Sequence, residues 1–160
     1  MVQTDASDVG IGAVLIQGDD GEERPLLYLS RKLEPRETRY STIEKEGLAI
    51  KWALESLRYY LLGREFDLET DHRALSWINT MKDRNARITR WYLDLQPFSF
   101  RIRDKSSKTN LLADYLSRLT TTAAPGEGEG NVAVFPATGK TLHQYTTPSL
   151  IPHVSQVGCY

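Results

Sequence analysis

Residues 2–30, VQTDASDVGIGAVLIQGDDGEERPLLYLS, decide the first half of the fold. A β-branched run at 10–16 ends in a Gly- and Asp-rich turn cluster at 17–21, and a second apolar run follows at 25–30. Two such runs on either side of a turn are typical of an antiparallel β-hairpin. With 2–6 as a preceding strand, the pattern predicts a three-stranded antiparallel meander.

The stretch 41–63 has the period of a helix. Its apolar and small residues fall on one stripe, at Ile43, Gly47, Ile50, Leu54, Leu57 and Leu61. Ser41 or Thr42 is a suitable N-cap, and Gly63 is a typical residue just beyond a helix end. The pattern therefore predicts one long helix across these residues.

Strands and helices alternate in the following residues. The pattern predicts a strand at 65–70, a short helix near 74–79, a helix around 86–95, a strand at 98–103 and a last helix at 110–119. A meander followed by alternating helices and strands predicts an α/β fold, in which helices cover a mixed sheet.

The composition changes after Leu119. Four of the seven prolines and five of the eleven glycines lie beyond this residue. Such segments rarely bury enough apolar surface to offset the entropy of ordering them. We therefore expect a working domain at 1–119 and a disordered tail or linker at 120–160, in which 132–135 has the composition of a short strand.

The overall composition excludes several classes of protein. A chain of 160 residues with 40% hydrophobic residues is long enough for one core, without a second large domain. Its one cysteine, Cys159, cannot form an internal disulfide or a thiolate zinc cluster. No apolar run approaches the roughly 18 to 20 residues of a membrane span, and the first residues lack the features of a signal peptide. We therefore expect an intracellular protein with no membrane partner.

The formal net charge of -1 conceals two opposed segments. Residues 1–23 carry six acidic side chains and no Lys or Arg, whereas residues 82–108 carry eight basic side chains against three acidic ones. Two solvated faces explain this asymmetry, and so does a metal-binding acidic end beside a phosphate-binding basic end. On the second interpretation, the candidates for contacts with nucleic acid are Arg84, Arg87, Arg90, Lys105 and Lys108.

Two acidic residues stand at the expected ends of strands. Asp5 lies where the first strand gives way to a polar turn, and Asp71 directly follows the strand at 65–70. Open α/β sheets bind their ligands outside the carboxyl ends of strands. Asp is also common in turns and at helix N-caps, which explains either residue on its own.

Two further acidic residues lie on expected helices. At about 100° per residue, Glu46 falls about 60° from the apolar stripe, at the edge of the buried face, whereas Lys45 points outward. The alternative for Glu46 is a long side chain that reaches water. Asp114 lies off the stripe of the last helix, where a solvated surface explains it on its own.

Together, the four acids form a more specific pattern. Several carboxylates at one end of a sheet, without a His or Cys cluster, are hard oxygen ligands that suit Mg²⁺ or Mn²⁺. Two such ions, roughly 3.5 to 4 Å apart, activate a water and stabilise the leaving oxygen of a phosphodiester. This pattern points to hydrolysis of nucleic acid, with Asp5, Glu46, Asp71 and Asp114 as catalytic metal ligands.

Seven motifs occur in a fixed order around these residues. They are Thr4-Asp5-Ala6-Ser7, Gly10-Ile11-Gly12-Ala13-Val14-Leu15, Tyr40-Ser41-Thr42-Ile43-Glu44-Lys45-Glu46, Tyr60-Leu61-Leu62-Gly63, Thr70-Asp71-His72, Arg90-Trp91 and Asn110-Leu111-Leu112-Ala113-Asp114-Tyr115-Leu116-Ser117-Arg118. The ordered set resembles the ribonuclease H domain of gypsy-type LTR retrotransposon reverse transcriptase polyproteins, over nearly all of residues 1–119.

The resemblance implies a fold, an activity and partners. The fold is the ribonuclease H-like fold, a five-stranded mixed sheet in which an antiparallel meander is followed by parallel strands and helices flank the sheet. The activity is that of a hydrolase, an endonuclease that cuts the RNA strand of an RNA/DNA hybrid with two Mg²⁺ ions, Mn²⁺ being the other candidate. By position, the metal-binding acids of the family fall on Asp5, Glu46, Asp71 and Asp114. The implied partners are the RNA/DNA hybrid and the reverse transcriptase domain of the parent polyprotein.

Other interpretations stay open beside this one. In the family the first strand begins several residues before the Thr-Asp-Ala-Ser motif, so we expect a truncated first strand here. The alternative function is therefore a catalytically impaired retroelement remnant that keeps the fold or nucleic-acid binding only. A polynucleotidyl transferase of the integrase kind shares this sort of acidic site, but the motif at 110–118 argues against it.

Overall fold

The computed structural model describes residues 1–19, 22–70, 86–104, 110–119, 132–136 and 143–145. Its elements, in chain order, are β1 (Val2–Ala6), β2 (Gly10–Asp19), β3 (Glu22–Lys32), the 3-10 helix η1 (Glu37–Arg39), α1 (Thr42–Ser56), α2 (Arg58–Leu61), β4 (Glu65–Thr70), α4 (Ala86–Leu95), β5 (Ser99–Asp104), α5 (Leu111–Arg118), β6 (Val132–Pro136) and β7 (His143–Tyr145). The strands form one sheet of order β5-β4-β1-β2-β3-β6-β7.

The first five strands make the expected mixed sheet. β1, β2 and β3 pair antiparallel as a meander, β4 pairs parallel with β1, and β5 pairs parallel with β4. This arrangement confirms the α/β, ribonuclease H-like fold. The expected shortening of the first strand stays a prediction.

Two more strands extend the sheet beyond β3. β6 pairs antiparallel with β3 from Leu27↔Pro136 to Arg31↔Val132, and β7 pairs antiparallel with β6. An outer strand presents backbone N–H and C=O groups with which another extended segment can pair. β6 contains 132–135, the part of the expected tail that has strand composition. The domain boundary at 119 and the linker character of 120–160 stay predictions, since most of that segment lies outside the described residues.

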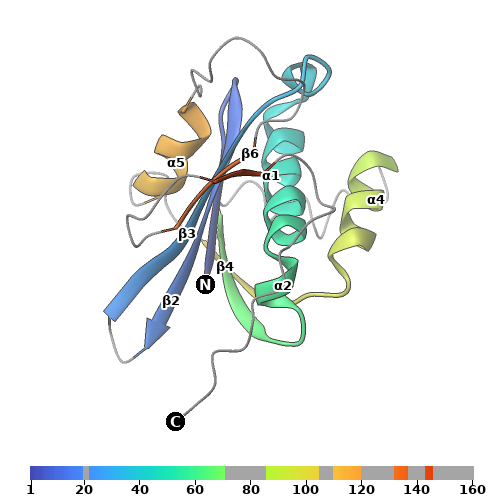
Figure 1. The fold of residues 1–160 in the computed structure, drawn as a ribbon. Coiled ribbons are helices and arrows are strands. Elements are labelled where there is room, and N and C mark those ends of the chain that lie inside the picture. The colour runs from blue at the N-terminus through green and yellow to red at the C-terminus, as the bar shows by residue number, and fades with distance from the viewer. Residues whose placement is uncertain (20–21, 71–85, 105–109, 120–131, 137–142, 146–160) are drawn as a thin grey trace.

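The sheet has helices on both faces (Figure 1), and a separate hydrophobic cluster lies on each face. The helices α1 and α4 cover one face and α5 covers the other. Along β2, Ile11 and Leu15 belong to the core under α1 and α4, whereas Val14 and Ile16 pack with Leu116 of α5. The side chains alternate because successive residues of a strand point to opposite faces.

The helix predicted at 41–63 is divided in two. It begins as expected, because Ser41 caps the first turn and exchanges hydrogen bonds with Glu44 in a capping box. α1 then ends at Ser56, and Leu57 has non-helical dihedral angles before α2 begins. Gly63 follows with φ of +73°, a conformation that favours glycine.

The remaining predicted elements agree closely with the structure where it describes them. β4 and α4 have the expected bounds, β5 is displaced by one residue, and α5 is one residue shorter at each end. The short helix expected near 74–79 lies outside the described residues. No helix in the described part of the chain is long and apolar enough to cross a bilayer.

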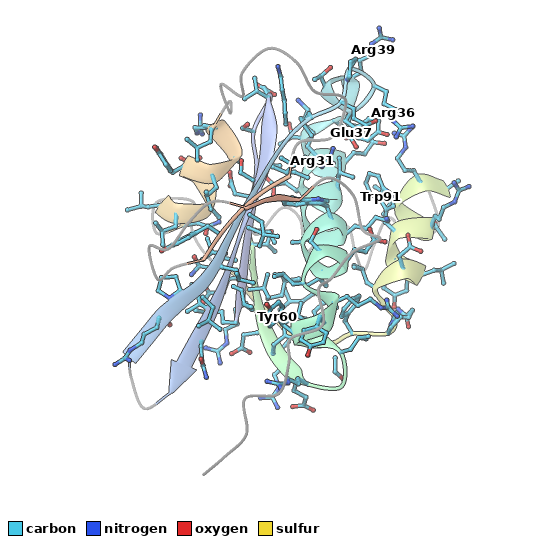
Figure 2. All side chains as sticks on the ribbon, in the orientation of Figure 1. Arg31, Arg36, Glu37, Arg39, Tyr60 and Trp91 are labelled. Atoms are coloured by element: carbon cyan, nitrogen blue, oxygen red, sulfur yellow. The ribbon has the colours of Figure 1, made fainter. Side chains whose placement is uncertain are left out.

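A buried ion pair holds the connection from β3 to α1. Arg31 donates to both oxygens of the Glu37 carboxylate, at 2.8 and 3.2 Å, and both side chains are almost fully buried. The same carboxylate accepts the backbone N–H of Glu34 at 2.8 Å. Figure 2 shows Arg31 and Glu37 near the N-terminal end of α1. The pair therefore fixes the segment that leads into the Ser41 cap.

Candidate active site

Asp5 lies at the C-terminal end of β1, opposite Gly12 of β2. Its side chain is half-buried and is held by α5, because the Ser117 hydroxyl donates to Asp5 Oδ2 at 2.8 Å. The first strand and the last helix of the expected domain therefore meet at this carboxylate.

Polar side chains tie both ends of α5 to the sheet. At the N-terminal end, Asn110 Nδ2 donates to the carbonyl of Thr4 at 2.9 Å. At the other end, Ser7 Oγ donates to the carbonyl of Ser117 at 2.6 Å, and Ser30 Oγ donates to that of Leu116 at 2.7 Å. The last carbonyls of a helix have no partner within the helix, so these two hydroxyls supply the hydrogen bonds that the helix itself cannot.

The backbone of α5 lies directly on β2. A Cβ atom at Gly12 would lie 2.6 Å from the carbonyl oxygen of Ala113 and 2.7 Å from the backbone nitrogen of Ser117. A Cβ atom at Gly10 would lie 2.6 Å from the carbonyl oxygen of Ser117. Such distances leave no room for a side chain, so the motif at 10–15 supplies the two glycines that the close approach requires.

Asp114 projects from the first turn of α5 and is half-buried. Its Oδ1 atom accepts hydrogen bonds from Arg118 Nη2 at 2.7 Å and from Arg118 Nε at 3.0 Å. Asp114 raises the pKa of Arg118 above its ordinary value, and the charges of Asp5 and Asp8 add to this effect. Asp114 and Asp5 thus belong to one electrostatic group around Arg118.

Glu46 is buried on α1, with 6% of its surface exposed. The helical period predicted a carboxylate at the edge of the buried face, and the burial of Glu46 agrees with that position. Glu44 has another role, because it closes the capping box and forms an ion pair with Arg87 at 2.9 Å. Since α1 packs against β1, Glu46 lies on the element that faces the strand of Asp5.

The outward direction predicted for Lys45 is wrong. Lys45 is only 8% exposed, and its Nζ forms an ion pair with Asp8 Oδ1 at 2.8 Å. The prediction took Ile43 as the centre of the buried stripe, whereas Ile43 is half-buried and all residues from 45 to 50 are buried. The turn after β1, which carries Asp8, covers the side of α1 that was expected to face water.

The four predicted ligands are only partly described. Asp71 lies outside the described residues; the strand that precedes it ends at Thr70, and the parallel pairing Gln3↔Glu69 puts the C-terminal ends of β1 and β4 at the same edge. Within the described residues, no group of three or more His, Cys, Asp or Glu side chains is placed to hold a metal ion. The structure connects Asp5 to α5, the helix of Asp114, through Ser117, and the complete set of ligands stays a prediction.

Of the predicted nucleic-acid contacts, the structure describes two. Arg87 forms the ion pair with Glu44 and lies 4.2 Å over the ring of Tyr40, and Arg90 is exposed on α4. Trp91 lies 6.0 Å from the same Tyr40 ring and points toward α1 (Figure 2). Arg87 thus helps to seat α4 on α1. Arg84, Lys105 and Lys108 lie outside the described residues.

The sequence of residues 1–98 matches the family described as "RNase H-like domain found in reverse transcriptase". The chain belongs to this family. It is an RNase H-like domain of the gypsy-type retrotransposon group. The chain is 42% identical over 119 residues to the "Retrovirus-related Pol polyprotein from transposon 297" of Drosophila melanogaster. This alignment covers 74% of the chain and 11% of the relative.

Two further relatives from the same organism support this membership. The corresponding polyprotein from transposon opus is 38% identical over 158 residues, or 94% of this chain and 16% of the relative. The polyprotein from transposon gypsy is 40% identical over 131 residues, or 81% of this chain and 12% of the relative. The RNase H-like domain therefore spans only a small part of the relatives it matches.

Sequence reasoning missed four polar residues of the RNase H-like domain, of which three tie α5 to its neighbours and Ser117 bonds to Asp5. They are Ser7, Ser30, Asn110 and Ser117, and the last three are at most 2% exposed. Ser7 and Ser117 stand beside the acidic residues in the motifs at 4–7 and 110–118. Their position beside the acidic residues was the available signal. For Ser117 a second signal was its place among apolar residues of a helix, because a buried polar group usually forms a hydrogen bond.

Proposed function

We propose that this RNase H-like domain is a metal-dependent endonuclease that hydrolyses the RNA strand of RNA/DNA hybrids. The observation that carries the proposal is the association of Asp5 with α5, the helix of Asp114, through the Ser117 hydroxyl. Asp5 and the helix that carries Asp114 come from opposite ends of the domain and meet at the C-terminal end of β1, which pairs parallel with β4. The carboxyl ends of strands are where α/β sheets bind their ligands. Family membership supports the same reaction.

The chemistry of the site suits Mg²⁺ or Mn²⁺. The described candidates are carboxylates, which are the hard oxygen ligands that these ions prefer. These carboxylates already attract one positive side chain. Arg118 donates a hydrogen bond to Asp114, and the charges of Asp5 and Asp8 help to raise the pKa of Arg118. We propose that Asp5, Glu46, Asp71 and Asp114 hold two ions, which when bound supply an activated water and stabilise the leaving oxygen.

The chain's own residues provide position and charge. Ser117 donates to the Asp5 carboxylate, and Arg118 neutralises Asp114, a charge that bound ions would also supply. Contacts to the phosphates of the hybrid are assigned to the basic residues Arg84, Arg87, Arg90, Lys105 and Lys108. The second proposed partner is the reverse transcriptase domain of a parent polyprotein.

The first test is cleavage of a labelled RNA/DNA hybrid in the presence of Mg²⁺. We expect Asp5→Asn, Asp71→Asn and Asp114→Asn each to lower the rate at least about a hundredfold, because metal ions contribute several kcal/mol to such reactions. Asp94→Asn is the matched control, since Asp94 lies on α4 and its carboxylate is 3.7 Å from Lys51. We expect that variant to cleave like the wild type.

Two results would count against the proposal in different ways. If Asp5→Asn cleaves as fast as the wild type, the metal-ligand assignment is wrong. If the wild type binds the hybrid without cleaving it, the chain is the catalytically impaired remnant named as the alternative. Binding that weakens steeply with salt would then identify phosphate contacts as the remaining function.

A further inference from the structure

We propose that Ser117 is a positioning residue that fixes the Asp5 carboxylate for metal binding. This inference rests on the proposed function. Ser117 is fully buried in the last turn of α5, and its Oγ lies 2.8 Å from Asp5 Oδ2, across 112 residues of sequence.

The Ser117 hydroxyl has a choice of acceptors. Oγ also lies 2.8 Å from the backbone carbonyl of Asp114, three residues earlier in the same helix. A hydroxyl carries one proton, so it donates fully to only one of them. Hydrogen bonds to a carboxylate are shorter and stronger than those to a neutral carbonyl, so the bond to Asp5 is favoured. The helical carbonyl then limits the positions that the hydroxyl can take.

The backbone of Ser117 is itself held in place. Ser7, two residues after Asp5, donates to the Ser117 carbonyl at 2.6 Å. On the sheet side, the absence of a side chain at Gly12 lets the Ser117 nitrogen approach β2. The contact is reciprocal, because the turn after β1 holds Ser117 and Ser117 in return holds the acid at the end of β1. Because the backbones of Ser117 and Asp5 are both held in place, the bond between their side chains restrains the plane of the Asp5 carboxylate.

Fixing that plane has a measurable value. Residues that orient metal ligands by hydrogen bonding typically contribute 10- to 100-fold to metal affinity or activity. Loss of the Ser117 hydroxyl removes one restraint on the rotation of the Asp5 carboxylate about its last torsion angle. Ordering that carboxylate would then cost more free energy when ions bind.

The test is Ser117→Ala in the full chain, with Mn²⁺ binding measured by electron paramagnetic resonance in the absence of nucleic acid. We expect about tenfold weaker Mn²⁺ binding, together with a lower kcat and an unchanged KM for the hybrid. Ser30→Ala is the matched control, because it also removes a buried hydroxyl bond to the end of α5, at 2.7 Å. We expect this control to unfold at lower urea concentration and to bind Mn²⁺ like the wild type.

The outcomes separate this inference from the function on which it rests. If the wild type binds Mn²⁺ and Ser117→Ala binds it equally well, the role of Ser117 is overturned and the proposed function stands. If the wild type binds no Mn²⁺, both are overturned. Should Ser117→Ala fail to fold, Ser117→Cys gives the same comparison with a weaker donor of similar size. Wild-type Mn²⁺ affinity in that variant would also overturn the inference.

Discussion

Lys45 and Glu46 are neighbours on α1. Both are buried, but their surroundings differ. Glu46 faces the interior, whereas the Lys45 side chain is 10% exposed and reaches an Asp8 side chain that is 97% exposed. The ammonium group of Lys45 holds the pKa of Asp8 below its ordinary value, first through their hydrogen bond and then through its charge. An exposed acid thereby neutralises a buried base.

This pair predicts a pH-dependent contribution to stability. Because the folded-state pKa of Asp8 is lowered, the contribution is present above the ordinary Asp pKa of about 3.9 and is lost as the pH falls through the folded value. We expect Asp8→Asn to lower the urea midpoint of unfolding at about pH 7, and the difference from the wild type to close as the pH falls well below the ordinary Asp pKa. A difference that is the same at every pH would show that charge is not its cause.

The candidate site shows how far single residues can be predicted. The 3.6-residue period distinguished the buried Glu46 from Glu44, which closes the capping box. Both features depend only on residues of one helix, so the sequence of that helix is enough to predict them. It failed for Lys45 because the turn that covers Lys45 belongs to another part of the chain. The bond from Ser117 to Asp5 was missed for the same reason: it joins residues that are close only after folding.

Among the elements, α5 depends most directly on its neighbour. Its backbone lies against β2 at Gly12, where no space remains between them, and its side chains pack on Val14 and Ile16 of the same strand. The carbonyls of its last turn are bonded to Ser7 and Ser30, and its first turn is tied through Asn110. Any shift of α5 would move Asp114 and Ser117 together relative to Asp5.

Gly12→Ala tests this close packing. A new Cβ atom would meet the backbone of α5 within 2.7 Å, and neither β2 nor α5 can move without breaking hydrogen bonds. We expect a loss of roughly 1 to 3 kcal/mol in the free energy of unfolding, measured with urea. Gly18→Ala on the same strand is the control, because its nearest contact would be Glu23 Cγ at 3.9 Å. Equal effects at the two positions would contradict the packing argument.

Local signals predicted most elements well. The N-cap of α1, the left-handed Gly63 and the alternation of β5 lie within a few residues of the features they explain. The break at Leu57 was not predicted, because leucine favours helix and nothing in its neighbours signals an end. Leu57 at the break and Leu61 after it are both buried, so tertiary packing explains the break.

At the scale of the whole molecule, the sheet has two more strands than expected, and both lie beyond β3, at the edge formed by the meander. β6 covers the outer edge of β3 along five paired positions, and β7 follows it. The order of the first five strands follows from the motifs and the family they resemble. The pairing of β6 could not be predicted in this way, since the sequence marks 132–135 as a strand without indicating which edge it joins.

Val134→Pro tests whether β6 protects β3. Proline lacks the N–H that a strand interior uses, so pairing opposite Leu29 should fail. We expect backbone amides at 27–31 to exchange with deuterium at least about tenfold faster than in the wild type. Amides of β4 and β5, at the far end of the sheet, serve as the internal reference. Unchanged exchange at 27–31 would show that β6 adds little to this edge.

The bond between Ser117 and Asp5 also has a consequence in time. It joins residues separated by 112 positions, one near the beginning of the chain and one at the end of α5. A protein is synthesised from its N-terminus and its early segments begin to fold first. Asp5 is therefore made long before the helix that orients it. On the proposed function, the growing chain is not a nuclease, and cutting begins only once α5 has been made and docked.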